Sequence, residues 1–217
     1  MQKSKGLFVS FEGIEGCGKT TQALLLAKWL KSRGHQVIIT REPGGTPLAE
    51  KIRKVLLDSR NHSMSPLTEL LLLQASRAQH LAQVIIPALK AGQVVVCDRF
   101  ADSSTAYQGY GRGMDLEMVN QLNQIAVDGC WPKLTLVFDL PVETGFARAA
   151  KRKRALDRME QQQKTFHRKV RQGFLAIAKA DPDRVKVLDG SFPPDVIQAA
   201  VRQLVLNSLG SPVPKKS

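Results

Sequence analysis

The chain has 217 residues, 43% of them hydrophobic, which is enough to bury the core of one domain without requiring a second. No apolar run approaches the roughly 20 residues of a membrane-spanning helix, and Glu12 interrupts the first apolar stretch before a signal-like segment is complete. We therefore expect a cytoplasmic protein with no membrane partner. The three cysteines, Cys17, Cys97 and Cys130, are scattered without metal-ligand spacing, which indicates free thiols rather than a zinc site.

The formal net charge of +13 has two interpretations. One is nucleic-acid binding, and the other is a site for several phosphate groups together with a basic tail. Lys and Arg are densest at residues 148–154, with a smaller group at Lys215 and Lys216. Neither group is interleaved with aromatic residues, as base-stacking surfaces are, so we do not expect a nucleic-acid partner.

The first predicted strand, residues 7–11, leads into a glycine-rich segment of the form G-x-x-x-x-G-K-S/T. This segment consists of Gly13, Ile14, Glu15, Gly16, Cys17, Gly18, Lys19, Thr20 and Thr21. Glycines allow successive backbone N–H groups to turn toward a phosphate, Lys19 supplies a charge for the β- and γ-phosphates, and the Thr20 hydroxyl can ligate Mg²⁺. A helical pattern follows over residues 22–33, and a helix that begins near Lys19 adds its positive end. The segment is thus predicted to be an NTP-binding P-loop rather than an ordinary glycine turn.

Four further β-type segments alternate with helical patterns along the chain. The strands are predicted at residues 36–40, 93–98, 134–139 and 185–189. The helices are predicted at residues 48–57, 66–83, 116–127, 142–153, 165–180 and 194–209. This alternation predicts an α/β fold, a five-stranded parallel sheet flanked by helices.

Charged residues follow most of these strands, at the sheet edge where ligands of parallel sheets gather. Residues 41–45 (REPGG) follow the second strand, and Pro43 with two glycines would hold Arg41 and Glu42 toward a cleft. The third strand ends in DRF, where Asp98 can hold magnesium through water and Arg99 can bind a phosphate with two hydrogen bonds. Residues 103–109 (SSTAYQG) add hydroxyls, a ring and an amide.

These three motifs after the P-loop, together with LDRME at residues 156–160, resemble the thymidylate kinase family, whose members phosphorylate dTMP to dTDP with ATP. The resemblance covers about residues 7–205, and other nucleoside monophosphate kinases share the P-loop but not this combination. The P-loop lacks the arginine of eukaryotic members, and the basic residues 148–154 resemble the bacterial arrangement, in which a mobile lid carries the catalytic arginine. A single P-loop kinase domain is therefore expected over residues 1–209, with a lid at about 148–160 and a flexible basic tail at 210–217.

The resemblance also implies roles for individual residues. The implied catalytic residues are Lys19, Asp98, Arg99 and two candidates in the lid, Arg152 and Arg154. Residues 13–21 would bind ATP, and the cofactor Mg²⁺ would be held by Thr20 and, through water, by Asp98. The implied dTMP-binding residues are Glu12, Glu42, Pro43, Arg53, Leu73, Arg77, Arg99, Ser104, Tyr107 and Gln108.

Within the dTMP set, the resemblance places Arg53, Arg99 and Lys19 at the phosphate, with Glu12 and Glu42 near the sugar and phosphate. Arg77, Ser104 and Gln108 would contact the thymine edge. Tyr107 would lie against the deoxyribose where a 2′-hydroxyl would clash, and the glycines after it favour a loop there.

One residue departs from the family pattern, since Leu73 occupies the position of the phenylalanine on which thymine usually stacks. Leucine lacks the π-system, so weaker dTMP affinity or a shifted pose is expected. The resemblance implies a homodimer, and the Leu70 to Leu73 run is consistent with an apolar helical interface. Two alternatives stay open: another nucleoside monophosphate kinase with broader base choice, and a nucleotide-binding protein that acts on nucleic acid.

Overall fold

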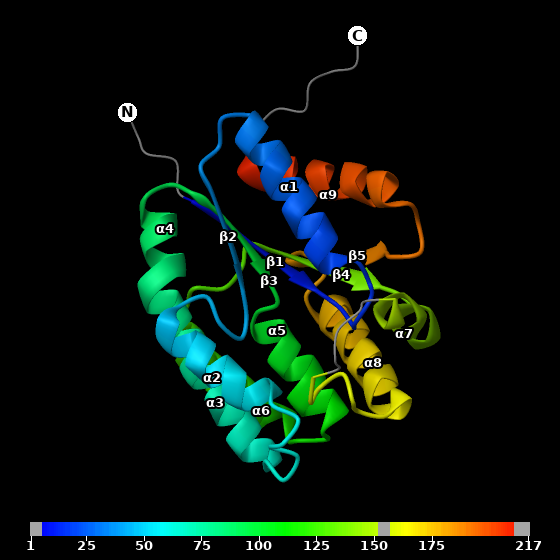
Figure 1. Ribbon diagram of the computed structural model, residues 1–217. Coiled ribbons are helices and arrows are strands. Elements are labelled where there is room, and N and C mark those ends of the chain that lie inside the picture. The colour runs from blue at the N-terminus through cyan, green and yellow to red at the C-terminus, as the bar shows by residue number, and fades with distance from the viewer. Residues whose placement is uncertain (1–5, 152–156, 211–217) are drawn as a thin grey trace.

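The computed structural model describes residues 6–151 and 157–210, and it contains one parallel sheet (Figure 1). The strand order is β2-β3-β1-β4-β5, so the P-loop follows the central strand. The strands are β1 (Leu7–Glu12), β2 (Val37–Arg41), β3 (Val94–Asp98), β4 (Leu134–Asp139) and β5 (Val185–Asp189). The predicted five-stranded parallel α/β fold is confirmed, and each predicted strand boundary lies within one residue of the observed one.

Helices cover both faces of the sheet, which explains the apolar character of β3. Figure 1 shows α1 (Lys19–Ser32) and α9 (Pro194–Leu209) together on one face, with α4 (Ile86–Lys90), α5 (Ala101–Ser104) and α8 (Lys164–Ala180) on the other. Val94 and Val96 pack into one buried cluster, whereas Val95 and Cys97 pack into a second cluster. Side chains alternate between the faces of a strand, so a strand covered on both sides needs apolar residues throughout.

Three helices form a group beside the sheet: α2 (Pro47–Leu57), α3 (Pro66–His80) and α6 (Leu116–Val127) (Figure 1). Helix α2 begins at a Thr46 cap, whose hydroxyl accepts from the Ala49 N–H at 3.1 Å, and Pro47 follows in the first turn. Helix α3 begins in the same way at Ser65 and Pro66. The Ser65 cap fixes the start of the helix that carries Leu73 and Arg77.

The helical segment that begins with α3 continues beyond residue 83, where the sequence pattern predicted its end. It continues through a π-helical turn, η1 (Leu81–Ile85), into α4, and the Ile86 N–H donates to the Leu81 carbonyl five residues back. Pro87 has no N–H for the carbonyl of Gln83, so a wider turn accommodates the missing bond.

Tyr107 lies in a second π-helical segment, η2 (Thr105–Gly111), so the prediction of a loop there was wrong. The glycines serve close packing. A Cβ on Gly109 would approach Leu116 Cδ2 to 2.6 Å, and a Cβ on Gly111 would approach Phe166 Cε2 to 2.7 Å. The side of the cavity that carries Tyr107 is therefore a packed helix.

Helix α7 (Val142–Ala150) begins where the sequence predicted a helix and reaches the start of the predicted lid at about residue 148. The lid candidates Arg152 and Arg154, and residues 211–217 of the predicted tail, lie outside the described residues. Across residues 6–151 and 157–210, no helix is both long and apolar enough to cross a membrane.

Candidate active site

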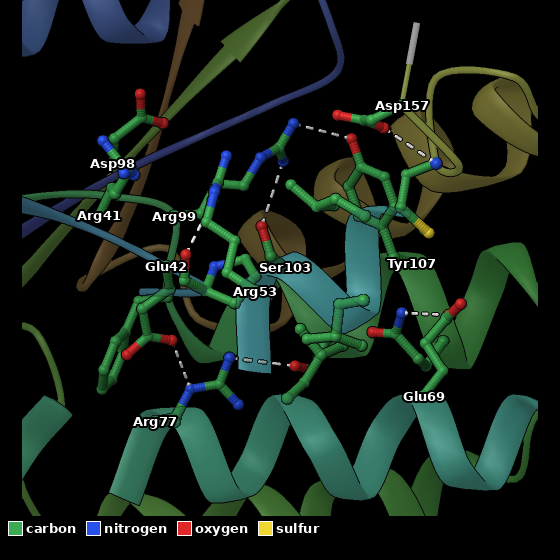
Figure 2. A pocket seen from close by; sticks show the side chains of 18 of the residues that line it. Arg41, Glu42, Arg53, Glu69, Arg77, Asp98, Arg99, Ser103, Tyr107 and Asp157 are labelled. Atoms are coloured by element: carbon green, nitrogen blue, oxygen red, sulfur yellow. Dashed lines mark hydrogen bonds and ion pairs between the residues drawn. The ribbon is translucent and has the colours of Figure 1, made fainter. Parts of the chain in front are cut away.

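One cavity opens at the carboxyl ends of β1, β2 and β3, as expected for a parallel sheet. Its wall is built from the P-loop, the REPGG segment, α2, α3, the DRF segment, η2 and residues 157–160. Figure 2 shows Arg99, Ser103 and Tyr107 on one side of this cavity, with Glu69 and Arg77 rising from a helix on the other side. We call these two sides the phosphate end and the base end.

Lys19 and the start of α1 supply positive charge at the phosphate end. Gly18 precedes the helix with φ 96°, a conformation that favours glycine, and places the first helical N–H groups at the cavity. The Lys19 ammonium is almost fully buried and donates to the Ile14 carbonyl at 3.2 Å. This arrangement suits a polyphosphate whose oxygens meet both backbone N–H groups and an ammonium.

Thr20 and Asp98 lie next to each other because β1 and β3 are paired in register, with Phe11 opposite Asp98. The Thr20 hydroxyl donates a short hydrogen bond to Asp98 Oδ2. A hydroxyl and a single carboxylate are the hard oxygen ligands that suit Mg²⁺, which usually keeps several waters and binds phosphate oxygens as well. The described residues hold no cluster of three or more His, Cys, Asp or Glu suited to a metal, so an ion here would depend on the nucleotide.

Arg99 is held at the centre of the phosphate end in a conformation that is rare outside glycine, with φ 72°. Its guanidinium donates to the Gly13 carbonyl at 3.0 Å, to the Tyr107 hydroxyl at 3.0 Å and, through a short ion pair, to Glu15. Burial alone would raise the pKa of Glu15, but Lys19 and Arg99 lower it to about 2. Both partners are therefore charged at neutral pH, and the guanidinium is fixed before any ligand binds.

Glu12 lies beneath this arginine, is fully buried and is not among the residues that line the cavity, so its place near the sugar and phosphate stays a prediction. Its carboxylate accepts from the Phe100 N–H and from the Ser103 hydroxyl, both at 2.6 Å. Burial and the nearby Asp102 raise the pKa of Glu12 to about 8. Glu12 thus braces the segment that presents Arg99.

Arg77 organises the base end and is only 2% exposed. Its Nε donates to Glu42 at 2.8 Å, and its Nη2 donates to Ser104 at 3.1 Å. Its Nη1 donates to Gln74 at 2.7 Å and to Asn123 at 3.1 Å. A buried arginine bound on several sides keeps one orientation, and its remaining N–H can serve only as a donor.

The comparisons with known proteins agree with this geometry. The family model for thymidylate kinase matches residues 11–201. The chain belongs to the thymidylate kinase family. A thymidylate kinase of Geotalea uraniireducens is 49% identical over 209 residues, 94% of this chain and 98% of the relative. A thymidylate kinase of Geobacter sulfurreducens is 48% identical over 207 residues, 93% of this chain and 97% of that protein.

The fold agrees with a solved structure of the same family. The crystal structure of thymidylate kinase from Ehrlichia chaffeensis superposes with a TM-score of 0.75 at 36% identity, covering 92% of this chain and 98% of that one. The resemblance inferred from the motifs is therefore confirmed, as is the P-loop kinase fold.

Most of the thymidylate kinase residues predicted from the sequence line one cavity. These are Lys19, Thr20, Glu42, Pro43, Arg53, Leu73, Arg77, Asp98, Arg99, Ser104, Tyr107 and Gln108. Arg53 reaches across from α2 and donates to the Pro43 carbonyl at 2.8 Å. Elements far apart in the sequence therefore bring the predicted phosphate-binding and base-binding residues into one space.

The cavity also contains residues to which sequence reasoning gave no role at the base or sugar. Glu15 is one, since it was assigned only to the P-loop, and Glu69 is another. Residues 157–160 form a further part of the wall, and Arg158 there pairs with Glu69. The sequence did carry a sign of Glu69, because residues 69, 73 and 77 are spaced four apart and share one face of α3.

Proposed function

We propose that this chain transfers the γ-phosphoryl group of ATP to dTMP, giving dTDP and ADP. One observation carries the proposal: a single cavity joins the P-loop and Arg99 at one end to Arg77, Ser104 and Gln108 at the other. Membership of the thymidylate kinase family supports the same reaction. The P-loop alone would fit many phosphotransferases, but the base end restricts the acceptor.

ATP is proposed to bind with its phosphates over residues 13–21, where the start of α1 and Lys19 neutralise the oxygens. The Thr20 hydroxyl and the Asp98 carboxylate are the proposed Mg²⁺-binding groups, which fits their contact and their oxygen chemistry. Bound Mg²⁺ would supply positive charge to the phosphate oxygens. Thr20 would hold the ion through its hydroxyl and Asp98 through water, in place of the hydrogen bond between them.

The dTMP phosphate is proposed to lie between Arg53 and Arg99, and the thymine between Leu73, Arg77 and Gln108. The Tyr107 hydroxyl accepts a hydrogen bond from Arg99 at 3.0 Å, and its side chain lines the cavity, where we propose that the ring lies against the deoxyribose. A ribose 2′-hydroxyl directed at this ring would meet packed aromatic carbon, which favours a deoxynucleotide. Phosphoryl transfer requires in-line positioning and neutralised oxygens, and the fixed guanidinium of Arg99 supports both.

A lid arginine is proposed to complete the site, with Arg152 and Arg154 as the two candidates. Residues 157–160 support this, because they attach the end of the lid segment to the cavity wall through Arg158, whose Nε donates to the Leu56 carbonyl at 2.8 Å. Alanine substitution of each arginine in turn separates them. The catalytic one should lower turnover at least about a hundredfold, and the other should change it little.

A homodimer through α3 and α6 is proposed. In the Leu70–Leu73 run, Leu70 is buried and Leu73 lines the cavity, so the run contributes less to a surface than the sequence suggested. Leu71 is 48% exposed on α3 and Ile125 is 75% exposed on α6, and these two helices pack together. Sedimentation of Ile125→Lys should show a shift toward the monomer, and an unchanged dimer would place the interface elsewhere.

The activity is tested by the rate of ADP release with ATP and Mg²⁺ against dTMP, dUMP, the thymine ribonucleotide, dCMP, dGMP and AMP. A strong preference for dTMP is expected, and chelation of Mg²⁺ should abolish turnover. Comparable rates across several bases would indicate a nucleoside monophosphate kinase with broad base choice. Absence of turnover with dTMP would overturn the proposed reaction.

A further inference from the structure

The side-chain carbonyl of Gln108 is a buried acceptor on the cavity wall. Gln108 is 1% exposed, and its Oε1 has no hydrogen-bond partner among the described residues. Buried polar atoms in folded proteins are almost always paired, so an acceptor left open at a binding cavity points to a donor on the ligand.

The other end of the same amide is fixed by Glu69. Gln108 Nε2 donates to Glu69 Oε1 at 2.8 Å. An ionised carboxylate can only accept, so it selects the orientation in which the NH₂ group of Gln108 faces Glu69 and leaves the carbonyl of this cavity-lining residue open for another donor.

Glu69 is held in its ionised form by two arginines. Arg112 Nη2 lies 3.0 Å from Glu69 Oε2, and Arg158 forms an ion pair with the same oxygen at 2.5 Å. Burial alone would raise the pKa of Glu69, but the hydrogen bonds from Arg112 and Gln108 lower it below its usual range. Arg158 is itself anchored by its backbone N–H to the Leu57 carbonyl at 3.2 Å.

We propose that Glu69 is a positioning residue that fixes the polarity of the Gln108 amide and so makes the site select pyrimidines that carry an N–H at position 3 over cytosine. This inference rests on the proposed function. Thymine and uracil present an N3–H donor beside the O4 acceptor, whereas cytosine presents an N3 acceptor beside an amino donor. The order of donor and acceptor on the base is therefore reversed between the two classes.

Arg77 and the Gln108 amide held by Glu69 together fix the order of donor and acceptor that the protein presents to the base. Both rise from α3 toward the cavity, about two turns apart (Figure 2). Arg77 can only donate, which suits O4, and Gln108 held by Glu69 can only accept, which suits N3–H. Cytosine would place its amino group against the guanidinium and its N3 lone pair against Gln108 Oε1, leaving buried groups unpaired.

The test is Glu69→Gln, assayed for kcat and KM with dTMP, dUMP and dCMP. A glutamine at residue 69 can donate or accept, so Gln108 can present either end of its amide to the base. The ratio of kcat/KM for dTMP over dCMP should fall at least about tenfold, mainly through KM, because a misplaced neutral hydrogen-bond partner costs about this much. The dTMP to dUMP ratio should stay as in the wild type, since both bases carry the N3–H.

Arg112→Gln is the matched control, because it removes one ion pair of Glu69 and leaves the carboxylate on Gln108. It should lower the melting temperature and leave the dTMP to dCMP ratio unchanged. If Glu69→Gln lowers stability but moves the ratio no more than Arg112→Gln does, the role of Glu69 is structural and the inference is overturned.

A second variant covers the case in which Glu69→Gln does not fold. Glu69→Asp keeps the charge between the two arginines but is one methylene shorter, so it withdraws the acceptor from Gln108. It should fold and lower the dTMP to dCMP ratio, and an unchanged ratio would overturn the inference. Failure of the proposed function is distinct, because then the wild type itself would not use dTMP.

Discussion

The two ends of the cavity are built in different ways. At the phosphate end, Lys19 and Arg99 belong to short motifs that directly follow strands, and backbone groups such as the carbonyls of Ile14 and Gly13 hold them. At the base end, side chains from several helices hold one another, as Arg77 of α3 does with Asn123 of α6 and Ser104 of α5. The cations of the phosphate end thus belong to motifs that are continuous in the sequence, whereas the base end is assembled from side chains of several helices.

This difference predicts how each end responds to change. Arg99 and its partner Glu15 are 16% and 18% exposed, so water can reach Glu15 when the guanidinium is removed, and the loss should appear mainly in catalysis. Removing a cation from the centre of a buried network leaves several polar groups unpaired, so the loss should lower the stability of the protein as well. Four substitutions test or refine the contrast.

Arg77→Met should have the largest effect on stability. It leaves the Glu42 carboxylate buried without its guanidinium, so the free energy of unfolding should fall by about 3 to 5 kcal/mol. Urea denaturation measures this change. Arg41→Met is the control, since its ion pair with Glu50 is exposed and should contribute less than about 1 kcal/mol. Equal losses of unfolding free energy in the two variants would contradict the proposed importance of the buried network at the base end.

Arg99→Ala should lower turnover at least about a hundredfold, about 3 kcal/mol at the transition state, because it removes a fixed donor near the reacting phosphates. Steady-state ADP release measures the loss, and circular dichroism checks that the protein remains folded. Arg60→Ala, at an exposed arginine, should retain normal turnover. Near-normal turnover of the Arg99 variant would remove that residue from the mechanism.

Glu12→Gln should change how stability depends on pH. The pKa of Glu12 is about 8 in the folded protein against 4.5 as the ordinary value, so its favourable contribution is complete below about pH 4.5 and is lost as the pH rises through about 8. Relative to the glutamine variant, the wild type should lose about 1.4 kcal/mol of unfolding free energy per pH unit across that window. Urea unfolding at several pH values measures the difference, and parallel profiles would contradict the raised pKa.

Leu73→Phe should have the smallest effect. A ring on this wall would stack on the base and lower the KM for dTMP by up to about tenfold, with little change in kcat, since such contacts contribute about 0.5 to 1.5 kcal/mol. Leu71→Phe on the exposed face of the same helix is the control and should leave KM unchanged. A rise in KM for the Leu73 variant would show that the cavity is shaped for leucine.

The same contrast explains what could be predicted from the sequence. The P-loop and DRF could be identified because each motif is continuous and each follows a strand, and in the structure Thr20 and Asp98 are in contact. The five strands were predicted within one residue because their apolar runs are short and bounded.

Other features of the site depend on tertiary packing, which no short sequence pattern indicates. The family resemblance predicts Glu12 near the sugar and phosphate, but no local pattern indicates that its carboxyl group accepts hydrogen bonds from Phe100 and Ser103 under the Arg99 segment. The glycines after Tyr107 were interpreted as loop formers, although they allow η2 to approach α6 and α8. Glu69 has no motif, and its role depends on Gln108 and Arg112, which lie about forty residues away in the chain.

Leu7 begins the central strand, and Ser208 near the end of α9 accepts a hydrogen bond at 2.7 Å from Lys133, just before β4 begins. Both positions are at the amino edge of the sheet, and the cavity opens at the carboxyl edge. A fluorophore or a surface anchor attached at a described residue on this edge would therefore lie on the side of the sheet opposite the cavity, so the enzyme can be immobilised there with the cavity left accessible.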